Sequence, residues 1–382
     1  MRIGIEAQRI FRKNKHGMDY VVLQEIKELQ QMDTKNEYYV FVKPGEDRCV
    51  ESSKNVHVIE LNCPTYPLWE QWALPRAAKK YGVEMLHCTS NTAPIWCDIP
   101  LILTLHDIIF LEPRDKQNHS LYQNMGWLYR RLNVPRILEK CRRIITVSNF
   151  EMENIIAKLD IPRERMAMIY NGYNEWFKPV EDEDEVYKKY IPEQGYFFFL
   201  GNTDPKKNTE RTLVAYSKYL TKSSIKRKLL MADLDSEYLN GIIERNHIEN
   251  IQENIVMPGY IVNSDLPYIY HSAFAFLYTS LRESFGIPLL EAMACGTPVI
   301  TSNTSSMPEI GGKDAILVNP ESCDEITDMM LRLEADNDLY ERQRNIGIER
   351  AKHFSWRKTA ENLLELYEDV YKEVSQNLNC NA

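Results

Sequence analysis

Short apolar runs alternate with longer amphipathic stretches along the first half of the chain. The runs predict strands, and the stretches between them have the spacing of helices. The predicted strands are 2–6, 38–42, 56–61, 85–89, 101–107 and 143–148, and the clearest helices are 19–31, 68–81 and 121–141. Strands separated by helices in this way indicate a parallel sheet with helices on both faces.

The alternation stops near 178–192, where two prolines and a run of acidic residues predict a linker with a short helix. A second series of strands then begins with the apolar run YFFFLG, typical of a buried parallel strand. The strands of this series are 196–201, 226–233, 254–260, 273–280, 297–302 and 315–320, and a long helical pattern at 355–376 follows them. The sequence therefore predicts an α/β protein with two doubly wound domains, divided as 1–178, a linker at 179–192, 193–354, and a C-terminal helix and tail at 355–382.

Composition supports two folded domains and narrows the functional classes. The 382 residues are 44% hydrophobic and 26% charged, which are ordinary values for a globular protein. The formal net charge is −9, because 55 acidic residues outnumber 46 basic ones, and this balance argues against general nucleic-acid binding. No run is long and apolar enough to predict a membrane span, and we expect no signal peptide. Eight scattered cysteines without a CxxC spacing predict reduced thiols in a cytoplasmic protein.

Two common nucleotide-binding signatures are absent from the sequence. The first predicted strand is not followed by GxGxxG, and GxxxxGK[ST] does not occur. Ligands of doubly wound sheets bind at the carboxyl ends of the strands. A nucleotide would therefore have to be held there by a different loop.

The segment 278–309 carries the richest candidate chemistry. A predicted strand leads into a polar loop, and Pro288 suits the first turn of the helix that follows. Gly296 is a suitable stop for that helix. The helix N-terminus would point at the carboxyl edge of the sheet, where its free N–H groups and dipole favour an anion such as a diphosphate. Gly286, in the loop, would let that anion approach the backbone closely.

Two acidic residues flank this predicted anion site. Glu283 lies just before the helix, and Glu291 lies inside it among leucines and a methionine. A carboxylate accepts two hydrogen bonds and therefore suits the paired hydroxyls of a ribose or a hexose. The alternative is that Glu291 is an acid on the helix surface and Glu283 an ordinary loop acid.

The same residues carry a family resemblance. ESFGIPLLE at 283–291 matches the Glu–seven residues–Glu signature of the group 1 (family 4) retaining glycosyltransferases, and its flanks resemble the donor-site block of that family. LGNTDPKKN at 200–208 resembles the family's glycine-then-lysine loop. TLHDIIFLEP at 104–113, ITVSNFEMENI at 145–155 and MIYNGYNEWFKP at 168–179 resemble motifs of its first domain. The resemblance covers nearly the whole chain.

The resemblance implies the GT-B fold, in which two Rossmann-like domains face a central cleft and the C-terminal helix crosses back to the N-terminal domain. The N-terminal domain would bind the acceptor, and the C-terminal domain would bind a nucleoside-diphosphate sugar. The implied reaction is the retaining transfer of a hexose to a hydroxyl of a glycan or a lipid-linked glycan. Because no enzymic nucleophile is placed for a double displacement, a front-face mechanism is favoured, with the leaving phosphate accepting the acceptor's proton.

Individual roles also follow from the matching motifs. Glu283 would contact hydroxyls of the donor sugar, Lys207 would neutralise the leaving diphosphate, and His106 would orient a sugar hydroxyl. Glu291 would hold the ribose hydroxyls. The other residues expected at the donor are Lys206, Gly201, Asn202, Ser284, Phe285, Gly286, Ile287 and Gly17. No metal and no other cofactor is expected, because Lys207 and the helix N-terminus would stabilise the diphosphate.

One departure from the family pattern concerns the 200–208 loop. Many members have an arginine directly after the glycine, where this chain has Asn202. The cationic role therefore passes to Lys207 with Lys206 as helper, although Lys206 could equally be a solvated surface lysine. The loop resembles that of members using GDP-mannose, which favours this donor weakly, while UDP-glucose, UDP-galactose and UDP-N-acetylglucosamine stay open.

The helix predicted at 121–143 is basic and partly amphipathic, with arginines set among tryptophan, tyrosine and leucine. Such a helix could contact an anionic membrane and would suit a lipid-linked acceptor at the inner face of the membrane. The alternative is a packed helix with a solvated basic face. Two other functions also stay open: a nucleotide-sugar epimerase of the same fold, and a non-catalytic protein that binds a sugar nucleotide.

Overall fold

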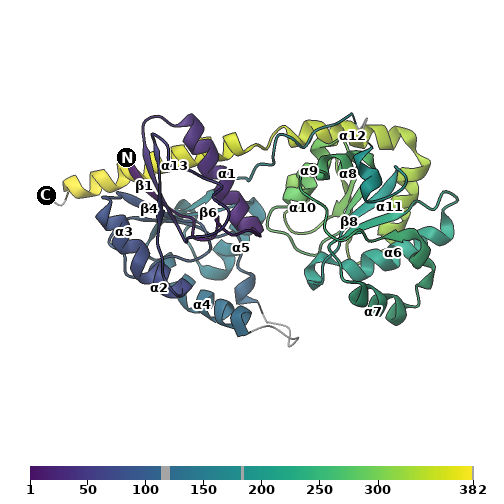
Figure 1. The fold of residues 1–382 in the computed structure, drawn as a ribbon, viewed down its shortest axis with the longest axis horizontal. Helices are drawn as coiled ribbons and strands as arrows, with labels where there is room; N and C mark the ends of the chain where they lie inside the picture. Colours follow the sequence, from purple (N-terminus) through teal and green to yellow (C-terminus); the bar gives the residue numbers. More distant parts are fainter. Residues whose placement is uncertain (113–120, 182–184, 381–382) are drawn as a thin grey trace. The chain divides into compact units, whose positions relative to one another are not determined.

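The computed structural model describes residues 1–112, 121–181 and 185–380. Contacts within the chain define two compact units, Met1–Asn171 with Trp356–Ala382, and Gly172–Ser355. Each unit is built on one parallel β-sheet with helices packed against it (Figure 1). The α/β class predicted from the alternation of strands and helices is confirmed.

The first unit has a seven-stranded sheet in the order β3-β2-β1-β4-β5-β6-β7. The strands are β1 (Arg2–Glu6), β2 (Glu37–Val42), β3 (Val56–Glu60), β4 (Met85–Cys88), β5 (Leu101–Thr104), β6 (Cys141–Thr146) and β7 (Met166–Met168). The α-helices are α1 (Gly17–Met32), α2 (Tyr66–Leu68), α3 (Leu74–Lys80), α4 (Leu121–Leu138), α5 (Asn149–Leu159) and α13 (Trp356–Cys380). A π-helical turn, η1 (Trp69–Ala73), joins α2 to α3, and two 3-10 turns are η2 (Ile109–Leu111) and η3 (Arg163–Arg165).

The second unit has a six-stranded sheet in the order β10-β9-β8-β11-β12-β13. The strands are β8 (Tyr196–Leu200), β9 (Leu229–Ala232), β10 (Ile255–Val256), β11 (Ala273–Tyr278), β12 (Val299–Ser302) and β13 (Ile316–Val318). The α-helices are α6 (Thr209–Lys222), α7 (Ser236–Asn246), α8 (Leu266–Ser272), α9 (Ile287–Ala294), α10 (Met307–Gly311), α11 (Cys323–Ala335) and α12 (Asn337–Ala351). The 3-10 turns are η4 (Val186–Lys189), η5 (Pro205–Lys207) and η6 (Glu249–Asn254).

The two sheets follow the same winding rule. In each, the first strand lies in the interior, the next two strands extend to one side, and the fourth strand pairs on its other side. The chain therefore continues from β1 and from β4 toward opposite sides of the first sheet, and it does the same from β8 and from β11 in the second sheet. A crevice opens at the carboxyl ends of such a strand pair, and ligands of this fold class bind there.

Apolar strand sequences explain where the cores lie. In β8, Phe197 and Phe198 are fully buried, which the wholly apolar run predicted. Phe197 packs edge-on against Tyr219 of α6 and Phe274 of β11, with ring centroids 5.1 and 5.7 Å apart. The sheet is thus covered by a helix on the face where Phe197 points, as a parallel strand buried on both faces requires.

The C-terminal helix α13 packs on the first unit. Ala360, Leu363, Tyr367 and Val370 recur at helical spacing and are buried in that unit's core. The Tyr367 hydroxyl lies 2.7 Å from Nδ1 of the buried His87. The expected return of this helix to the N-terminal domain is therefore confirmed.

The division between the units differs from the boundary at 178 and the linker at 179–192 drawn from the sequence. The structure divides the chain after Asn171. The ring of Phe177 packs against Tyr270 in the second unit. Within the described part of 179–192, the Tyr190 hydroxyl and the Lys189 ammonium both bind Asp265, at 2.8 and 3.1 Å. The sequence predicted a linker here, but these side chains attach it to the second unit.

Two further differences concern element lengths. β7 has three residues, too few to give a recognisable apolar pattern, and it was not predicted. β5 ends at Thr104 rather than at 107, because beyond Leu105 the His106 amide donates to Oδ1 of Asn91 at 2.7 Å and not to the neighbouring strand. Within the described ranges, no helix is long and apolar enough to cross a membrane.

Candidate functional site

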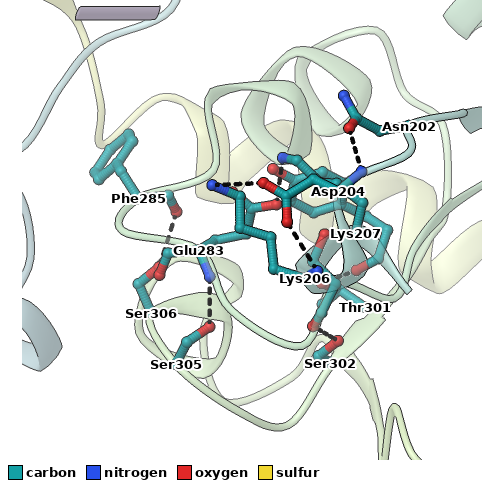
Figure 2. Close-up of polar contacts among 12 residues, drawn as sticks. Asn202, Asp204, Lys206, Lys207, Glu283, Phe285, Thr301, Ser302, Ser305 and Ser306 are labelled. Carbon is teal, nitrogen blue, oxygen red and sulfur yellow. Dashed lines mark hydrogen bonds and ion pairs between the residues drawn. The ribbon is translucent and has the colours of Figure 1, made fainter. Parts of the chain in front are cut away.

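The carboxyl ends of β8 and β11 place two loops next to each other in the second unit. The loop 201–208 follows β8, and the loop 279–286 follows β11. Because β8 and β11 are neighbours in the sheet, both loops lie at the crevice of the winding. Lys207 of the first loop and Glu283 of the second therefore meet, as Figure 2 shows.

Lys207 and Glu283 form an ion pair across these loops. The Lys207 ammonium lies 2.6 Å from Oε1 of Glu283, although the residues are 76 positions apart in the sequence (Figure 2). The side chains keep 26% and 12% of their surface exposed. The same ammonium lies 5.8 Å from the centre of the Tyr278 ring. The pair is thus fixed on one side and reachable by a ligand on the other.

Two serines hold the Glu283 loop by its backbone. The Glu283 amide donates to Oγ of Ser305 at 3.2 Å, and the Ser306 hydroxyl lies 2.9 Å from the Glu283 carbonyl and 3.2 Å from that of Phe285 (Figure 2). Sequence analysis gave these serines no role. The signal was available, since both lie within the 278–309 block that resembles the family.

Asn208 ties the loops to the sheet. It is buried in the left-handed conformation, with φ of 60°, which asparagine tolerates better than most residues. Its side-chain amide donates to the carbonyls of Thr279 and Pro320, at 2.9 and 2.7 Å. Asn208 is the last residue of the loop that resembles the family's glycine-then-lysine loop, but its residue type alone indicated no function. Its position fixes the neighbouring Lys207.

The other residues expected in the 201–208 loop have mainly local contacts. A Cβ on Gly201 would lie 2.8 Å from Cβ of Leu234, so close packing against the turn after β9 requires glycine here. The Asn202 side-chain oxygen accepts from the Asp204 amide at 2.8 Å. Lys206 faces Asp204 at 3.4 Å rather than Glu283, and its side chain is 38% exposed. The structure therefore separates the roles of the two lysines.

The loop 279–286 leads directly into the N-terminus of α9. Gly286 caps α9 with φ of 101°, and a Cβ there would lie 2.6 Å from Cε of Met307. The Phe285 ring is buried and packs against Phe354. Ser284 is partly buried in the same loop, and Ile287 is the first residue of α9. The N–H groups at this end of the helix favour an anion.

Glu291 lies inside α9 and is largely enclosed. Burial raises its pKa to about 8. Near neutral pH this carboxyl therefore holds a proton in the absence of a ligand. A buried acid among apolar neighbours is unexpected from packing alone, which strengthens the functional interpretation of Glu291 over that of an acid on the helix surface.

Gly17 and His106 lie in the first unit. A Cβ on Gly17, at the start of α1, would meet no atom within 4 Å, so the space beside it is open. His106 is buried, and its Nε2 lies 3.1 Å from the Thr89 carbonyl, which can only accept. Burial lowers the pKa of His106. A neutral ring that donates through Nε2 has Nδ1 as a hydrogen-bond acceptor.

One cation near this edge of the first sheet was missed. Arg9 follows β1 closely, and its Nε lies 2.8 Å from Oδ1 of Asp19 in the first turn of α1. Oδ2 of the same carboxylate accepts from the His16 amide at 3.0 Å. No sequence signal distinguished Arg9 from other arginines. In the part of the chain that the structure describes, no cluster of three His, Cys, Asp or Glu side chains is placed to hold a metal.

The second unit thus combines a doubly wound sheet with a candidate anion site, a lysine and two acidic residues. Two family models match the chain. Residues 16–176 match the model for Glycosyltransferase Family 4, and residues 181–350 match that for Glycosyl transferases group 1. The two matches together cover most of the chain. The protein belongs to the group 1, family 4 glycosyltransferases, and it is a hexosyltransferase with the GT-B fold.

Relatives with assigned activities include mannosyltransferases of O-antigen synthesis. The chain is 29% identical to O-antigen chain mannosyltransferase B of Escherichia coli over 273 residues, which are 70% of this chain and 69% of that protein. It is 26% identical to the serotype-specific mannosyltransferase WbdA of Escherichia coli over 69% of this chain, and it spans about a third of WbdA.

Solved structures share the fold at low sequence identity. Anabaena HepE, solved in complex with UDP and glucose, has a TM-score of 0.71 and 15% identity. The alignment covers 97% of this chain and all of the HepE chain. The likeness supports two Rossmann-like parallel-sheet units and nothing finer.

Gly286→Ala tests whether the backbone before α9 must be free of a side chain. Two effects add: strain at positive φ, and a collision of the new Cβ with Met307. We expect the free energy of unfolding to fall by about 2 kcal/mol or more, measured by urea denaturation. Gly259→Ala is the matched control, because its φ is 79° and nothing lies within 4 Å of its Cβ. An equal loss in both variants would contradict the packing argument.

Glu291→Gln tests the protonation state of the buried acid. As the pH rises from about 4.5 toward 8, the unfolded chain loses the Glu291 proton while the folded chain retains it, so the wild-type protein loses stability. Glutamine does not titrate. We therefore expect the variant to gain about 1 kcal/mol or more relative to wild type across this window, measured by urea denaturation. Glu237→Gln on α7 removes an exposed acid as control. Parallel pH profiles of wild type and Glu291→Gln would refute the assignment.

Proposed function

We propose that this glycosyltransferase moves a hexose from a nucleoside diphosphate to a hydroxyl of a glycan or a lipid-linked glycan, with retention of the anomeric configuration. The observation that carries the proposal is the Lys207–Glu283 ion pair beside the N-terminus of α9. A cation and helix N–H groups suit a diphosphate, and an adjacent carboxylate suits sugar hydroxyls.

Each residue then has a distinct task in the second unit. Lys207 and the N–H groups of α9 neutralise the charge that grows on the diphosphate as it leaves. Glu283 accepts hydrogen bonds from hydroxyls of the donor sugar. Glu291 binds the ribose hydroxyls, and because accepting two hydrogen bonds favours its charged form, nucleotide binding is coupled to proton release. Lys206, which pairs with Asp204, assists as a more exposed cation.

The reaction is a front-face substitution. The bond between the anomeric carbon and the diphosphate oxygen breaks, and a bond to the acceptor oxygen forms on the same face. The acceptor's proton passes to the departing phosphate oxygen, so no side chain has to act as nucleophile. The residues stabilise charge and fix orientation, and the proposed mechanism needs no metal or other cofactor.

The first unit is proposed to bind the acceptor. Gly17, with open space beside it, allows a ligand to approach the start of α1. His106, as a neutral acceptor at Nδ1, orients a hydroxyl of the donor sugar. We also propose that the enzyme acts in the cytoplasm at the inner face of a membrane, where a lipid-linked acceptor is presented.

GDP-mannose is the proposed donor. The DPKKN loop resembles that of members using it, and relatives named as mannosyltransferases support the same sugar. Since a bound ligand raises apparent stability, we expect GDP to raise the melting temperature more than UDP or ADP at equal concentration. A thermal-shift series with the three nucleotides checks this. A larger shift with UDP would replace the proposed donor by a UDP-sugar.

Lys207→Met and Glu283→Gln test the chemistry. Each removes one charge of the pair, and we expect transfer from GDP-mannose to fall by a factor of about 1,000 or more, measured as GDP release with a membrane-extracted acceptor. The fold should survive, because both side chains lie at the open edge of the site. Lys222→Met, an exposed lysine of α6 that pairs with Asp328, is the control and should keep wild-type activity.

The same assay separates the alternatives. Full activity of Lys207→Met or Glu283→Gln would refute these roles. Conversion of the donor sugar without any acceptor would indicate an epimerase, whereas a transferase gives at most slow hydrolysis. Nucleotide binding with no turnover on any acceptor would indicate a binding protein.

A further inference from the structure

Large apolar side chains are exposed in three segments of the first unit, at 68–72, at 96 and at 125–132. Leu68, Trp72, Met125, Leu128 and Leu132 are each at least 50% exposed, and Trp96 is 75% exposed. We call these six residues the tryptophan surface. Single exposed apolar residues are common, but a group of this size marks an interaction site.

One part of the tryptophan surface is a stripe along α4. Met125, Leu128 and Leu132 are spaced three and four residues apart, so they lie on one face of the helix. The core-facing side of α4 is already occupied by Val134 and Ile137, which are fully buried. The exposed stripe is therefore a second apolar face, which packing within the unit does not require.

The other part borders a groove. Trp72 and Trp96 line a hollow of about 330 Å³ together with Pro75, Arg76, Lys79 and Ile99. The Arg76 guanidinium lies 4.2 Å from the centre of the Trp72 ring. Leu68 lies one helical turn before Trp72. Aromatic rings beside cations are the side chains that favour the boundary between lipid headgroups and acyl chains.

Hydrogen bonds join the two parts. Nε2 of Gln71, next to Trp72, donates to the Tyr129 hydroxyl at 2.8 Å, and Tyr129 follows Leu128 in α4. Lys140, just after α4, donates to the Ile95 carbonyl beside Trp96. Helices α2 and α4 also lie next to each other in Figure 1. The stripe and the groove consequently belong to one part of the first unit.

The charge of these segments indicates which kind of partner the tryptophan surface binds. Residues 66–80, 95–99 and 124–140 carry seven lysines and arginines against three acidic residues, in a chain whose formal net charge is −9. One of the three acids, Glu70, is fully buried. An apolar surface with an excess of cations is complementary to a bilayer that contains anionic lipids. A second copy of the chain would set these cations against each other.

We propose that the tryptophan surface docks the enzyme on an anionic lipid bilayer, with Trp72 and Trp96 inserted at headgroup level. The proposal extends the basic helix at 121–143 to a second segment and adds an apolar contribution to the electrostatic one. It rests on the proposed function in one respect, that a lipid-linked acceptor would require such contact. Vesicle binding itself can be measured without any transfer.

The test measures partition of the full chain onto vesicles of phosphatidylglycerol mixed with phosphatidylcholine, by flotation. We expect wild type to bind these vesicles and to bind phosphatidylcholine vesicles weakly. The double variant Trp72→Ala/Trp96→Ala should lose binding by about tenfold or more, because two large apolar side chains no longer leave water. The matched control is Trp176→Ala/Ile225→Ala, which removes two exposed apolar side chains of the second unit and should bind as wild type.

Other outcomes would overturn the proposal. Unchanged vesicle binding by Trp72→Ala/Trp96→Ala would do so, as would equal loss in the control. A shift of wild type to a dimer that the variant abolishes, without vesicle binding, would assign the surface to a second copy. The GDP-induced rise in melting temperature should be the same in wild type and Trp72→Ala/Trp96→Ala. Its absence from wild type would count against the proposed donor and leave the docking result standing.

Discussion

The two loops of the candidate site depend on the buried side-chain amide of Asn208. Its side-chain N–H groups donate to the carbonyl of Thr279, just after β11, and to that of Pro320, shortly after β13. Those carbonyls lie where the sheet ladder stops, and burial without a donor would be costly. Aspartate would put an acceptor against two acceptors. Because Lys207 directly precedes this anchor, its ammonium meets Glu283, and the Lys206 carbonyl, accepting from the Leu281 amide, fixes the same loop a second time.

The charges of the site are arranged locally, independent of the net charge of −9. Glu283 neutralises Lys207. In the proposed mechanism, a diphosphate competes for Lys207, and sugar hydroxyls then bind the freed carboxylate. Both groups are already in place before the ligand arrives, so little reorganisation opposes the reaction. Glu291 is different, since burial raises its pKa to about 8 and favours its uncharged form. In the proposed mechanism, ribose hydroxyls stabilise the charged form. Before a ligand binds, the paired cation and the neutral acid leave no uncompensated charge at the site.

Most of the fold could be predicted from the sequence, because strands buried on both faces have unbroken apolar runs, as β8 does. The turn into α9 was equally visible, since Pro288 and Gly296 mark its two ends. Three features could not be predicted. The Lys207–Glu283 ion pair joins two loops whose residues are 76 positions apart, and no local sequence pattern predicts it. Asn208 acts through a conformation and two partners that are known only after folding. The sequence predicts a linker at 179–192, yet Tyr190 donates to Asp265 of the second unit.

The tryptophan surface depends in turn on a buried network around Glu70. This carboxyl accepts hydrogen bonds from Tyr66, Tyr129 and Gln71, and burial raises its pKa. It lies in the π-helical turn η1, where the Leu74 amide reaches back five residues to the Trp69 carbonyl. The turn buries Trp69 while Trp72, three residues on, is exposed. An acidic protein is repelled by an anionic membrane at long range, but screening limits that repulsion to about 8 Å at physiological salt. The proposed docking therefore relies on local cations beside the exposed rings, such as Arg76 over Trp72, which act where the two surfaces touch.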